Sequence, residues 1–374
     1  TIQILPKIYK DSPDINDDLQ QASRNLLHML AVSGQIPINE QDINPLLKKE
    51  LSWFEILTRI FANHLMHEWQ KGQYRSYTNR EENLPVLKGK WKIEKQIRRV
   101  GMLHRFDVVY DDFSGDNPFN RVFRFVVERL WVFSRDSENR RVLSCLRQWL
   151  DEIQLVPRLS LGDVEQIPVN RLNQRFEPVF NLAKLFLDDG AFQLIAGSEN
   201  TFSMTFDMNA LFESFLISFI KKNFQRILPD THQNFDLVPH SRRSTYYLAI
   251  DHSKKNAFQL QPDLAFREGS DFPLLMDAKY KMLDRDAARL GVSQDDFYQM
   301  YAYAHRYNCS RVVLVYPETA GTSVPLFASF RLIGEPKFIE ARTVNLKGEF
   351  WTPSGKAQLI NELHTILEGH NEYG

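Results

Sequence analysis

Cysteine is nearly absent from this chain, whose 374 residues include only Cys145 and Cys309. The two lie far apart without metal-type spacing, which argues against a disulfide framework and against a cysteine-ligated zinc or iron–sulfur site. The sequence also lacks any apolar run near the ~20 residues that cross a bilayer, and no signal-peptide pattern opens it. We therefore expect a protein of the reducing cytoplasm with no membrane partner.

A nucleotide-binding P-loop is missing as well. No Gly-x4-Gly-Lys-Ser/Thr segment occurs, and Ser354-Gly355-Lys356-Ala357 fails the pattern at both ends. Any nucleotide hydrolysis linked to this chain must therefore come from another protein. Charge of one sign does not dominate either, since 46 Lys and Arg oppose 47 Asp and Glu. Overall charge therefore does not identify a nucleic-acid binder.

The length and composition favour a globular protein of about two domains, because 43% of the residues are hydrophobic and 25% are charged. We expect a mixed α/β fold, with an N-terminal α+β domain at 1–200 and a second domain at 201–374. Helical periodicity marks 17–34 and 51–69, and a strand-like, basic stretch covers about 73–113. The change of character near 196–200 sets the boundary.

A local basic strip lies within the first domain. It combines seven cations with one carboxylate, Glu94; the cations are Lys88, Lys90, Lys92, Lys95, Arg98, Arg99 and Arg105. Such a strip binds DNA phosphates and releases their counterions. A solvated charged face is an equally good interpretation.

The order of elements becomes readable in the second domain. A strongly apolar helix at 207–226 precedes predicted strands at 245–250, 257–266 and 273–281. A helix opened by Ser293 runs to about 307, and Arg311–Tyr316 is a strand of the buried type. The predicted order is helix, three strands, helix, strand.

Two of these strands bring together the groups that phosphodiester hydrolysis needs. The reaction requires a nucleophilic water and neutralisation of developing charge, which one or two divalent metals held by carboxylates supply. A hairpin would place Asp263 beside Asp277 and Lys279. The two-residue period of a strand puts Lys281 on the same face, where it could contact DNA. The lysine beside the metal can orient or deprotonate the water, or offset phosphate charge.

A plain ion pair on a solvated sheet face is the competing interpretation, because Asp-x-Lys alone is common. Two features favour the site. The apolar run 273–276 suggests that Asp277 lies on a buried strand, where a carboxylate is costly unless it is paired or binds metal. Pro262 removes a ladder donor just before Asp263 and marks a strand end or bulge.

Three further side chains are candidates. Glu213 lies within an apolar sector of its helix and would complete a metal site with Asp263 and Asp277; a helix carboxylate bonded to a backbone donor or an arginine is as plausible. Gln299 and Tyr303, at i and i+4, face one way and would position the carboxylates or touch DNA. A half-buried amphipathic stripe would look the same.

These features resemble the PD-(D/E)xK nuclease superfamily. The motif is literal in Pro262-Asp263 and Asp277-Ala278-Lys279, and Gln299-x-x-x-Tyr303 looks like the helix motif of its RecB-like branch. The segment from Phe206 to Glu213, together with Asp277-Ala278-Lys279-Tyr280, resembles the McrC family, the nuclease subunit of McrBC restriction systems that depend on 5-methylcytosine. The resemblance is specific over 206–317 and looser before it.

The resemblance implies an endonuclease subunit that uses Mg²⁺ or Mn²⁺ to cleave methylated double-stranded DNA. It implies a McrB-like AAA+ GTPase hexamer as partner, with the N-terminal region docking into the ring and stimulating its GTPase. Two alternatives remain open: a stand-alone RecB-like nuclease of repair or defence, and a non-catalytic adaptor that activates a ring ATPase. Intact Asp263, Asp277 and Lys279 argue against the adaptor.

Overall fold

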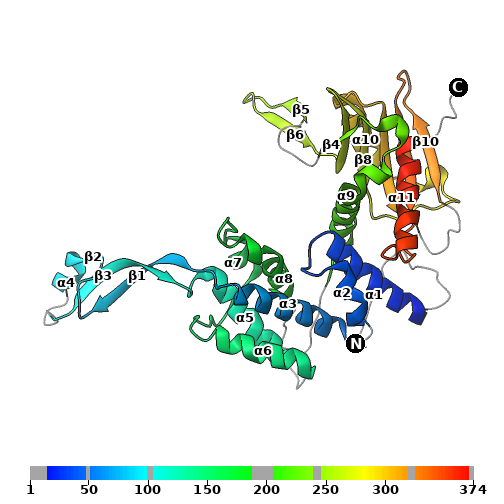
Figure 1. Cartoon of the computed structure of the whole chain (residues 1–374). Coiled ribbons are helices and arrows are strands. Elements are labelled where there is room, and N and C mark those ends of the chain that lie inside the picture. Colours follow the sequence, from blue (N-terminus) through cyan, green and yellow to red (C-terminus); the bar gives the residue numbers. More distant parts are fainter. Residues whose placement is uncertain are drawn as a thin grey trace. The chain divides into compact units, whose positions relative to one another are not determined.

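The computed structural model describes residues 15–47, 51–98, 104–187, 205–238, 246–318 and 325–369. The chain divides into two compact units, whose elements Figure 1 labels. Unit 1 comprises Thr1–Gly34, Asn39–Ile43 and Phe206–Gly374, and unit 2 comprises Gln35–Ile38 and Asn44–Thr205. The division thus differs from a single boundary near residue 200, because the N-terminal helix belongs to the C-terminal unit.

The helices of unit 2 pack around a core rich in phenylalanine. They are α3 (Trp53–Gln70), α5 (Pro118–Phe133), α6 (Ser137–Trp149), α7 (Leu161–Glu165) and α8 (Glu177–Leu187), with a 3-10 turn at Gln174–Phe176. Side chains of Ser52, Asn117 and Asp136 accept the first free N–H groups of α3, α5 and α6 and so fix where these helices begin. Phe119 stacks on Phe180 with 4.4 Å between ring centroids.

A three-stranded sheet in unit 2 forms an arm beside these helices (Figure 1). It contains β1 (Ser76–Leu84), β2 (Lys90–Trp91) and β3 (Phe106–Ser114), with α4 (Ile93–Arg98) between the last two. Strand β3 lies in the middle and pairs antiparallel with both neighbours. The predicted basic, strand-like stretch therefore forms the arm.

Unit 1 is built on a six-stranded sheet of order β10-β11-β9-β8-β7-β4. The strands are β4 (Asp236–Val238), β7 (Leu264–Glu268), β8 (Asp271–Ala278), β9 (Arg311–Pro317), β10 (Phe327–Arg331) and β11 (Phe338–Val344). The helices are α1 (Ile15–Val32), α2 (Glu40–Leu47), α9 (Met208–Ile227), α10 (Gln294–Arg306) and α11 (Pro353–Glu368), with 3-10 turns at Asp230–His232 and Ala288–Gly291. Helix α2 crosses the division between the units.

The central strands β8 and β9 are parallel neighbours and almost fully buried. Helix α10 packs on the face that carries Leu275 and Leu314 in one apolar cluster. Alternation of side chains puts Met276 on the opposite face, where α9 contacts β8 and packs against α1 and α11. Asp277 shares the face of Leu275 and therefore lies under α10.

The predicted strand at 257–266 is wrong as a single element. Strand β6 (Asn256–Leu260) ends at Leu260 and pairs with β5 (Tyr246–Ile250) in a separate two-stranded sheet. Strand β7 starts only at Leu264, because Pro262 has no N–H to continue a ladder. In chain order, the first strand of the six-stranded sheet is β4, which the sequence did not predict. Among the described residues no helix is both long and apolar enough to cross a bilayer.

Helix α1 joins unit 1 through contacts with remote parts of the chain. It packs against α9, and Asn25, which is 2% exposed, donates from its amide to Leu346 O at 2.6 Å. A buried amide satisfied by a backbone carbonyl more than 300 positions away fixes the helix in one orientation.

We expect Glu55→Ala to destabilise unit 2 by about 3 kcal/mol, because it leaves buried donors without an acceptor. The Glu55 carboxylate is 8% exposed and accepts from Ser134 Oγ at 2.8 Å, Arg135 N at 2.6 Å, Asp136 N at 3.1 Å and Asn139 Nδ2 at 2.7 Å. Urea unfolding of the full chain, followed by tryptophan fluorescence, measures the loss.

The matched control is Glu94→Ala, which removes an exposed carboxylate from the first turn of α4. It should change the free energy of unfolding by less than about 0.5 kcal/mol. Equal losses in the two variants would contradict a structural role for the Glu55 contacts.

Candidate active site

Two carboxylates meet where β7 and β8 pair. The strands are antiparallel with Leu264 opposite Met276, so Asp263, one residue before β7, lies opposite Asp277. Asp263 Oδ2 accepts the N–H of Ala278 at 2.7 Å. The two side chains are 9% and 2% exposed. The hairpin therefore brings the acids together in a buried setting.

Lys279 follows directly after β8 and reaches back to this pair. Its backbone N–H donates to Val315 O at 2.8 Å, which holds the segment against β9 after the strand has ended. Its Nζ lies 2.6 Å from Asp277 Oδ2 and donates to Gln299 Oε1 at 3.0 Å. The amine is thus fixed between a strand and a helix.

Gln299 and Tyr303 connect Lys279 to the backbone before Asp263. Gln299 Nε2 donates to Tyr303 OH at 3.0 Å, and that hydroxyl donates to Gln261 O at 2.9 Å. Tyr303 is 2% exposed. The run of hydrogen bonds from Lys279 through α10 to Gln261 fixes the amine relative to both acids.

Both aspartates of the site are harder to ionise than a free aspartic acid. Burial, followed by repulsion from Asp277, raises the pKa of Asp263 to about 8, although the Ala278 N–H and Lys279 oppose the shift. Burial also raises the pKa of Asp277, against the attraction of Lys279. The charge of Glu213 pushes both pKa values in the same direction. An added cation would relieve this repulsion.

Lys279 stays a cation in this setting. Burial alone would lower its pKa, but the attraction of Asp277 and then of Asp263 and Asp296 outweighs it and the pKa is raised. Burial likewise raises the pKa of Tyr303, with repulsion from Asp277 and Asp263 adding to the shift. The lysine therefore offers positive charge and not a basic amine, and the tyrosine remains a neutral donor.

Glu213 lies near the two aspartates but does not form a three-ligand group with them. It is half-buried on α9, and its charge reaches both acids. Within the described ranges, however, no group of three or more His, Cys, Asp or Glu side chains is arranged to hold a metal ion. The role of Glu213 as a third metal ligand therefore stays a prediction, and the structure shows it as a carboxylate whose charge acts on both aspartates.

Lys281 lies beyond the end of the strand that was predicted to contain it but still faces α10, as Lys279 does. Strand β8 ends at Ala278, so the two-residue alternation no longer applies beyond it. Lys281 Nζ donates to both oxygens of Asp296, at 2.9 and 2.7 Å, and to Ser293 Oγ at 3.4 Å. The pair ties the segment after Lys279 to the first turn of α10.

Asp296 is a residue whose role the sequence reading missed. Its backbone N–H donates to the Ser293 hydroxyl at 3.2 Å and so begins the helix at the predicted residue. Its carboxylate is 7% exposed and raises the pKa of Asp277 by repulsion. Asp296 stands three residues before Gln299 on one helix, and this spacing is the sequence signal that places its carboxylate near the site.

The basic strip lies in unit 2 and not on the unit that carries the acids. Lys88 lies 3.9 Å from Asp112 and above the ring of Tyr110, and Lys92 lies 3.2 Å from Glu81. Lys90 is exposed on β2. Arg99 and the side chain of Arg98 lie outside the described residues. Much of the strip's charge is therefore offset by carboxylates of its own sheet.

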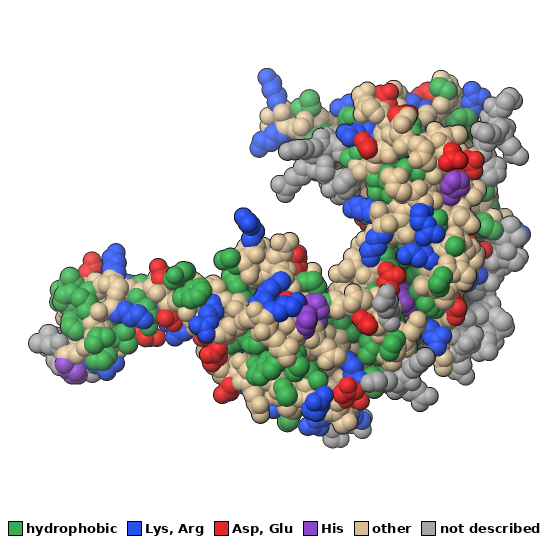
Figure 2. Space-filling view, in the orientation of Figure 1, with side chains coloured by type: hydrophobic (Ala, Val, Ile, Leu, Met, Phe, Trp, Pro, Cys, Tyr) green, Lys and Arg blue, Asp and Glu red, His purple; other side chains and the backbone are tan. Residues whose placement is uncertain are grey.

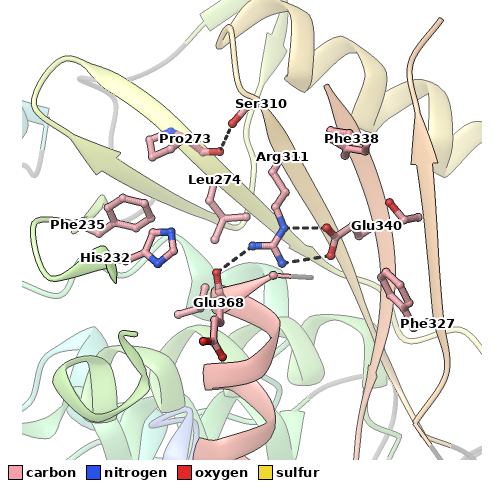
Figure 3. Close-up of a pocket in the computed structure, with 13 residues that line it drawn as sticks. His232, Phe235, Pro273, Leu274, Ser310, Arg311, Phe327, Phe338, Glu340 and Glu368 are labelled. Carbon is pink, nitrogen blue, oxygen red and sulfur yellow. Dashed lines mark hydrogen bonds and ion pairs between the residues drawn. The ribbon is translucent and has the colours of Figure 1, made fainter. Parts of the chain in front are cut away.

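A cavity of about 530 Å³ opens at the other end of the sheet, away from the two acids (Figure 3). Its central guanidinium, Arg311, donates to Glu340 at 2.9 and 3.2 Å and to Leu367 O at 2.9 Å. Arg311 is thereby neutralised and caps the end of α11. Neither Asp263 nor Asp277 lines this cavity.

Comparison with known proteins gives a consistent assignment. A family model described as McrBC 5-methylcytosine restriction system component matches residues 1–317. A chain of the refined half-complex from the tetradecameric assembly of Thermococcus gammatolerans McrB AAA+ hexamers with bound McrC is similar, with 25% identity and a TM-score of 0.59 over 97% of this chain and 80% of that chain. No curated protein matches the chain.

A second solved structure, the cryo-EM structure of the Thermococcus gammatolerans McrBC complex, contains a chain of 28% identity that covers 59% of this chain and 63% of its own length. Its TM-score of 0.43 is too low to add to the fold assignment.

We expect the metal-free protein to lose stability between about pH 4 and pH 8 because of Asp263. The folded pKa of about 8 exceeds the unfolded value of about 3.9, so the folded state binds more protons within this window. The stabilisation from the protonated Asp263 carboxyl is complete below the unfolded pKa and is lost above the folded pKa. Thermal unfolding in EDTA should show that the melting temperature of Asp263→Asn falls less steeply with pH than that of the wild type. Each kcal/mol of lost stability corresponds to about 2–4 °C.

Asp236→Asn serves as the control, because that carboxylate is exposed on the edge strand β4 beside Arg267. Its pH profile should follow the wild type. Parallel profiles for wild type and Asp263→Asn would mean that Asp263 does not carry the buried charge.

Proposed function

The chain belongs to the McrBC family, and from that premise we propose that it is the DNA-cleaving subunit of a modification-dependent restriction system of the cytoplasm. In this proposal it hydrolyses phosphodiester bonds of methylated double-stranded DNA at Asp263, Asp277 and Lys279. The observation that carries the proposal is a pair of buried carboxylates on adjoining strands with one lysine between them and a helix.

A divalent metal fits this pair. Mg²⁺ prefers hard oxygen ligands and is bound by one or two carboxylates, keeping several waters for exchange with phosphate oxygens. Burial, with repulsion between the acids, raises the pKa values of Asp263 and Asp277, so ionising both carboxyl groups is costly unless a cation binds between them. Mg²⁺, or Mn²⁺ in its place, would supply activation of water and neutralisation of charge on the phosphate.

The chain's own residues perform the remaining tasks. Lys279, held protonated, places a positive charge beside the carboxylates, where phosphate charge develops during hydrolysis. Gln299 and Tyr303 hold that amine in position, so that little reorganisation is needed when DNA binds. Glu213 adds negative potential that favours entry of the metal.

The order of elements supports membership of the PD-(D/E)xK superfamily. Helix α9 is followed by strands β4, β7 and β8 of one sheet, then by α10 and by β9 parallel to β8. This is the superfamily order of helix, three strands, helix and strand, with the β5–β6 hairpin as an insertion. Asp263 and Asp277 stand at the ends of neighbouring strands, as that core requires.

A McrB-like AAA+ GTPase hexamer is the partner that we propose. The similar solved complex contains McrB AAA+ hexamers with bound McrC, and the sequence lacks a P-loop of its own. The arm of unit 2 offers apolar side chains that are more than half exposed: Tyr77, Val86, Leu87, Ile93, Ile97 and Phe113. Tyr77 and Phe113 lie at one end of the paired strands and the other four beyond the opposite end, and exposed apolar groups of this kind are typical of a protein interface.

Asp277→Asn should lower metal-dependent cleavage of methylated plasmid at least 100-fold in the presence of partner and GTP, because it removes one of two metal-binding charges. EDTA should abolish cleavage by the wild type. Circular dichroism and thermal unfolding check that the variant, whose side chain keeps its size, remains folded.

Asp295→Asn is the matched control, because it changes an exposed carboxylate on the same first turn as Asp296. Cleavage by this variant should stay within about twofold of wild type. Full activity of Asp277→Asn, or cleavage without divalent metal, would refute the proposed chemistry.

Leu87→Asp and Ile97→Asp should lower stimulation of the partner's GTPase at least tenfold, because each places a charge in an apolar contact. Steady-state GTP hydrolysis at increasing chain concentration measures the effect. Leu172→Asp, at a 76% exposed leucine of unit 2 outside the arm, should leave stimulation unchanged. Equal effects of all three variants would place the docking surface elsewhere.

A further inference from the structure

The β5–β6 hairpin stands apart from the large sheet of unit 1 but leads directly into the candidate site. Among the described strands, Tyr246–Ile250 and Asn256–Leu260 pair with each other and with no third strand. Gln261 and Pro262 alone separate the hairpin from Asp263. Whatever the hairpin contacts is therefore coupled by a short, proline-containing segment to one of the two acids.

The base of the hairpin is fixed on α10. The ring of Tyr246 lies 4.4 Å from that of Tyr307, and the guanidinium of Arg306 donates to Tyr247 O at 2.8 Å. Leu260 is 6% exposed, and its carbonyl accepts from the Tyr307 hydroxyl at 3.3 Å. Since α10 also carries Gln299 and Tyr303, the hairpin and the site share one rigid support.

The outer part of the hairpin exposes apolar side chains that nothing in the described structure covers. Leu248, Ile250 and Phe258 are 52%, 69% and 74% exposed. The register, in which Tyr247 faces Gln259 and Ala249 faces Ala257, sets Leu248 opposite Phe258. Phe258 has a φ of 57°, which is strained for a residue other than glycine. An isolated two-stranded hairpin is only marginally stable in water, and exposed apolar side chains add little to its stability.

The turn adds positive charge to this apolar surface. Asp251 Oδ1 accepts the N–H groups of Ser253 at 2.8 Å and Lys255 at 2.9 Å, so its carboxylate closes the turn. Lys254 and Lys255 are exposed, and no ion pair joins either of them to another described residue. Figure 2 shows cationic side chains in blue beside green hydrophobic ones on this projecting hairpin.

We propose that the β5–β6 hairpin binds the DNA duplex on one side of the scissile phosphate, an inference that rests on the proposed nuclease function. Lys254 and Lys255 contact backbone phosphates, and Leu248, Ile250 and Phe258 contact sugars and base edges in a groove. A two-stranded ribbon fits the major groove of B-DNA, and cations beside apolar side chains match phosphates beside base edges.

The reach of the hairpin limits where these contacts fall. Lys255 lies eight residues before Asp263, and a strand rises about 3.3 Å per residue, so the two are at most about 26 Å apart. At about 3.4 Å per base pair this corresponds to about eight base pairs. Protection by the hairpin should therefore end about eight base pairs from the cut, on one side only.

The test measures duplex binding by the full chain in an Asp277→Asn background, which separates binding from cleavage. Lys254→Glu combined with Lys255→Glu should weaken binding at least tenfold and reduce the slope of log affinity against log salt by about two. The footprint should shorten on one side. Phe258→Ala should weaken binding with the salt slope unchanged, because it removes no charge.

The control combines Lys221→Glu with Arg331→Glu, which makes the same charge change at exposed positions of α9 and β10. Equal losses in the control and the hairpin variant, unchanged binding by the hairpin variant, or no duplex binding by the parent chain at low salt would each overturn the proposal. So would dissociation of a dimer by Phe258→Ala with DNA affinity unchanged, since a second copy would then cover the hairpin.

The two proposals fail in different ways. A wild-type chain that cleaves DNA only through Asp277 but binds it without the hairpin refutes the hairpin inference and leaves the nuclease. Hairpin-dependent duplex binding without metal-dependent cleavage refutes the nuclease and leaves a DNA-binding surface.

Discussion

Burial of two carboxyl groups side by side at the end of one strand pair is the constraint around which unit 1 is organised. Asp263 and Asp277 are both nearly inaccessible, and one lysine balances them only in part. Such a cluster costs stability in a protein that has no ligand for it. The surrounding contacts fix the two carboxyl groups close together. A site for a hard cation requires such an arrangement.

Helix α10 makes most of the contacts that position the site. Its first turn carries Asp296, which pairs with Lys281, and its middle carries Gln299 and Tyr303, which fix Lys279 and Gln261. Its last turn anchors the β5–β6 hairpin through Arg306. One helix on the sheet face of Asp277 thus positions the acids, the amine and the projecting ribbon together. Damage to this helix should therefore affect all three at once.

The pairing of β7 with β8, and the helix side chains beside it, were predictable because their determinants are local. Pro262, the apolar run before Asp277 and the i, i+4 spacing of Gln299 and Tyr303 all act within about fifteen residues. Strand β4 escaped prediction because three residues, Asp236–Val238, are too few to show a period. The break at Leu260 was missed although Pro262 signals it, because β6 and β7 both have strand-like composition.

Other features depend on distant parts of the chain and have no local signature. The assignment of α1 to unit 1 rests on contacts such as that between Asn25 and Leu346. The distance of Glu213 from the two aspartates is set by how α9 packs on β8, which helical periodicity does not specify. Strand β8 was predicted to run to Lys281, three residues past its end at Ala278, because the alternating composition continues there.

Calorimetric titration of the metal-free chain with Mn²⁺ tests the central claim most directly, since it needs neither DNA nor partner. Below pH 8 the Asp263 carboxyl is largely protonated, so metal binding should release about one proton, seen as an enthalpy that depends on the buffer. The release should fade above that pH, and Asp277→Asn should abolish binding. Undetectable binding, or binding that Asp277→Asn leaves intact, would contradict the account.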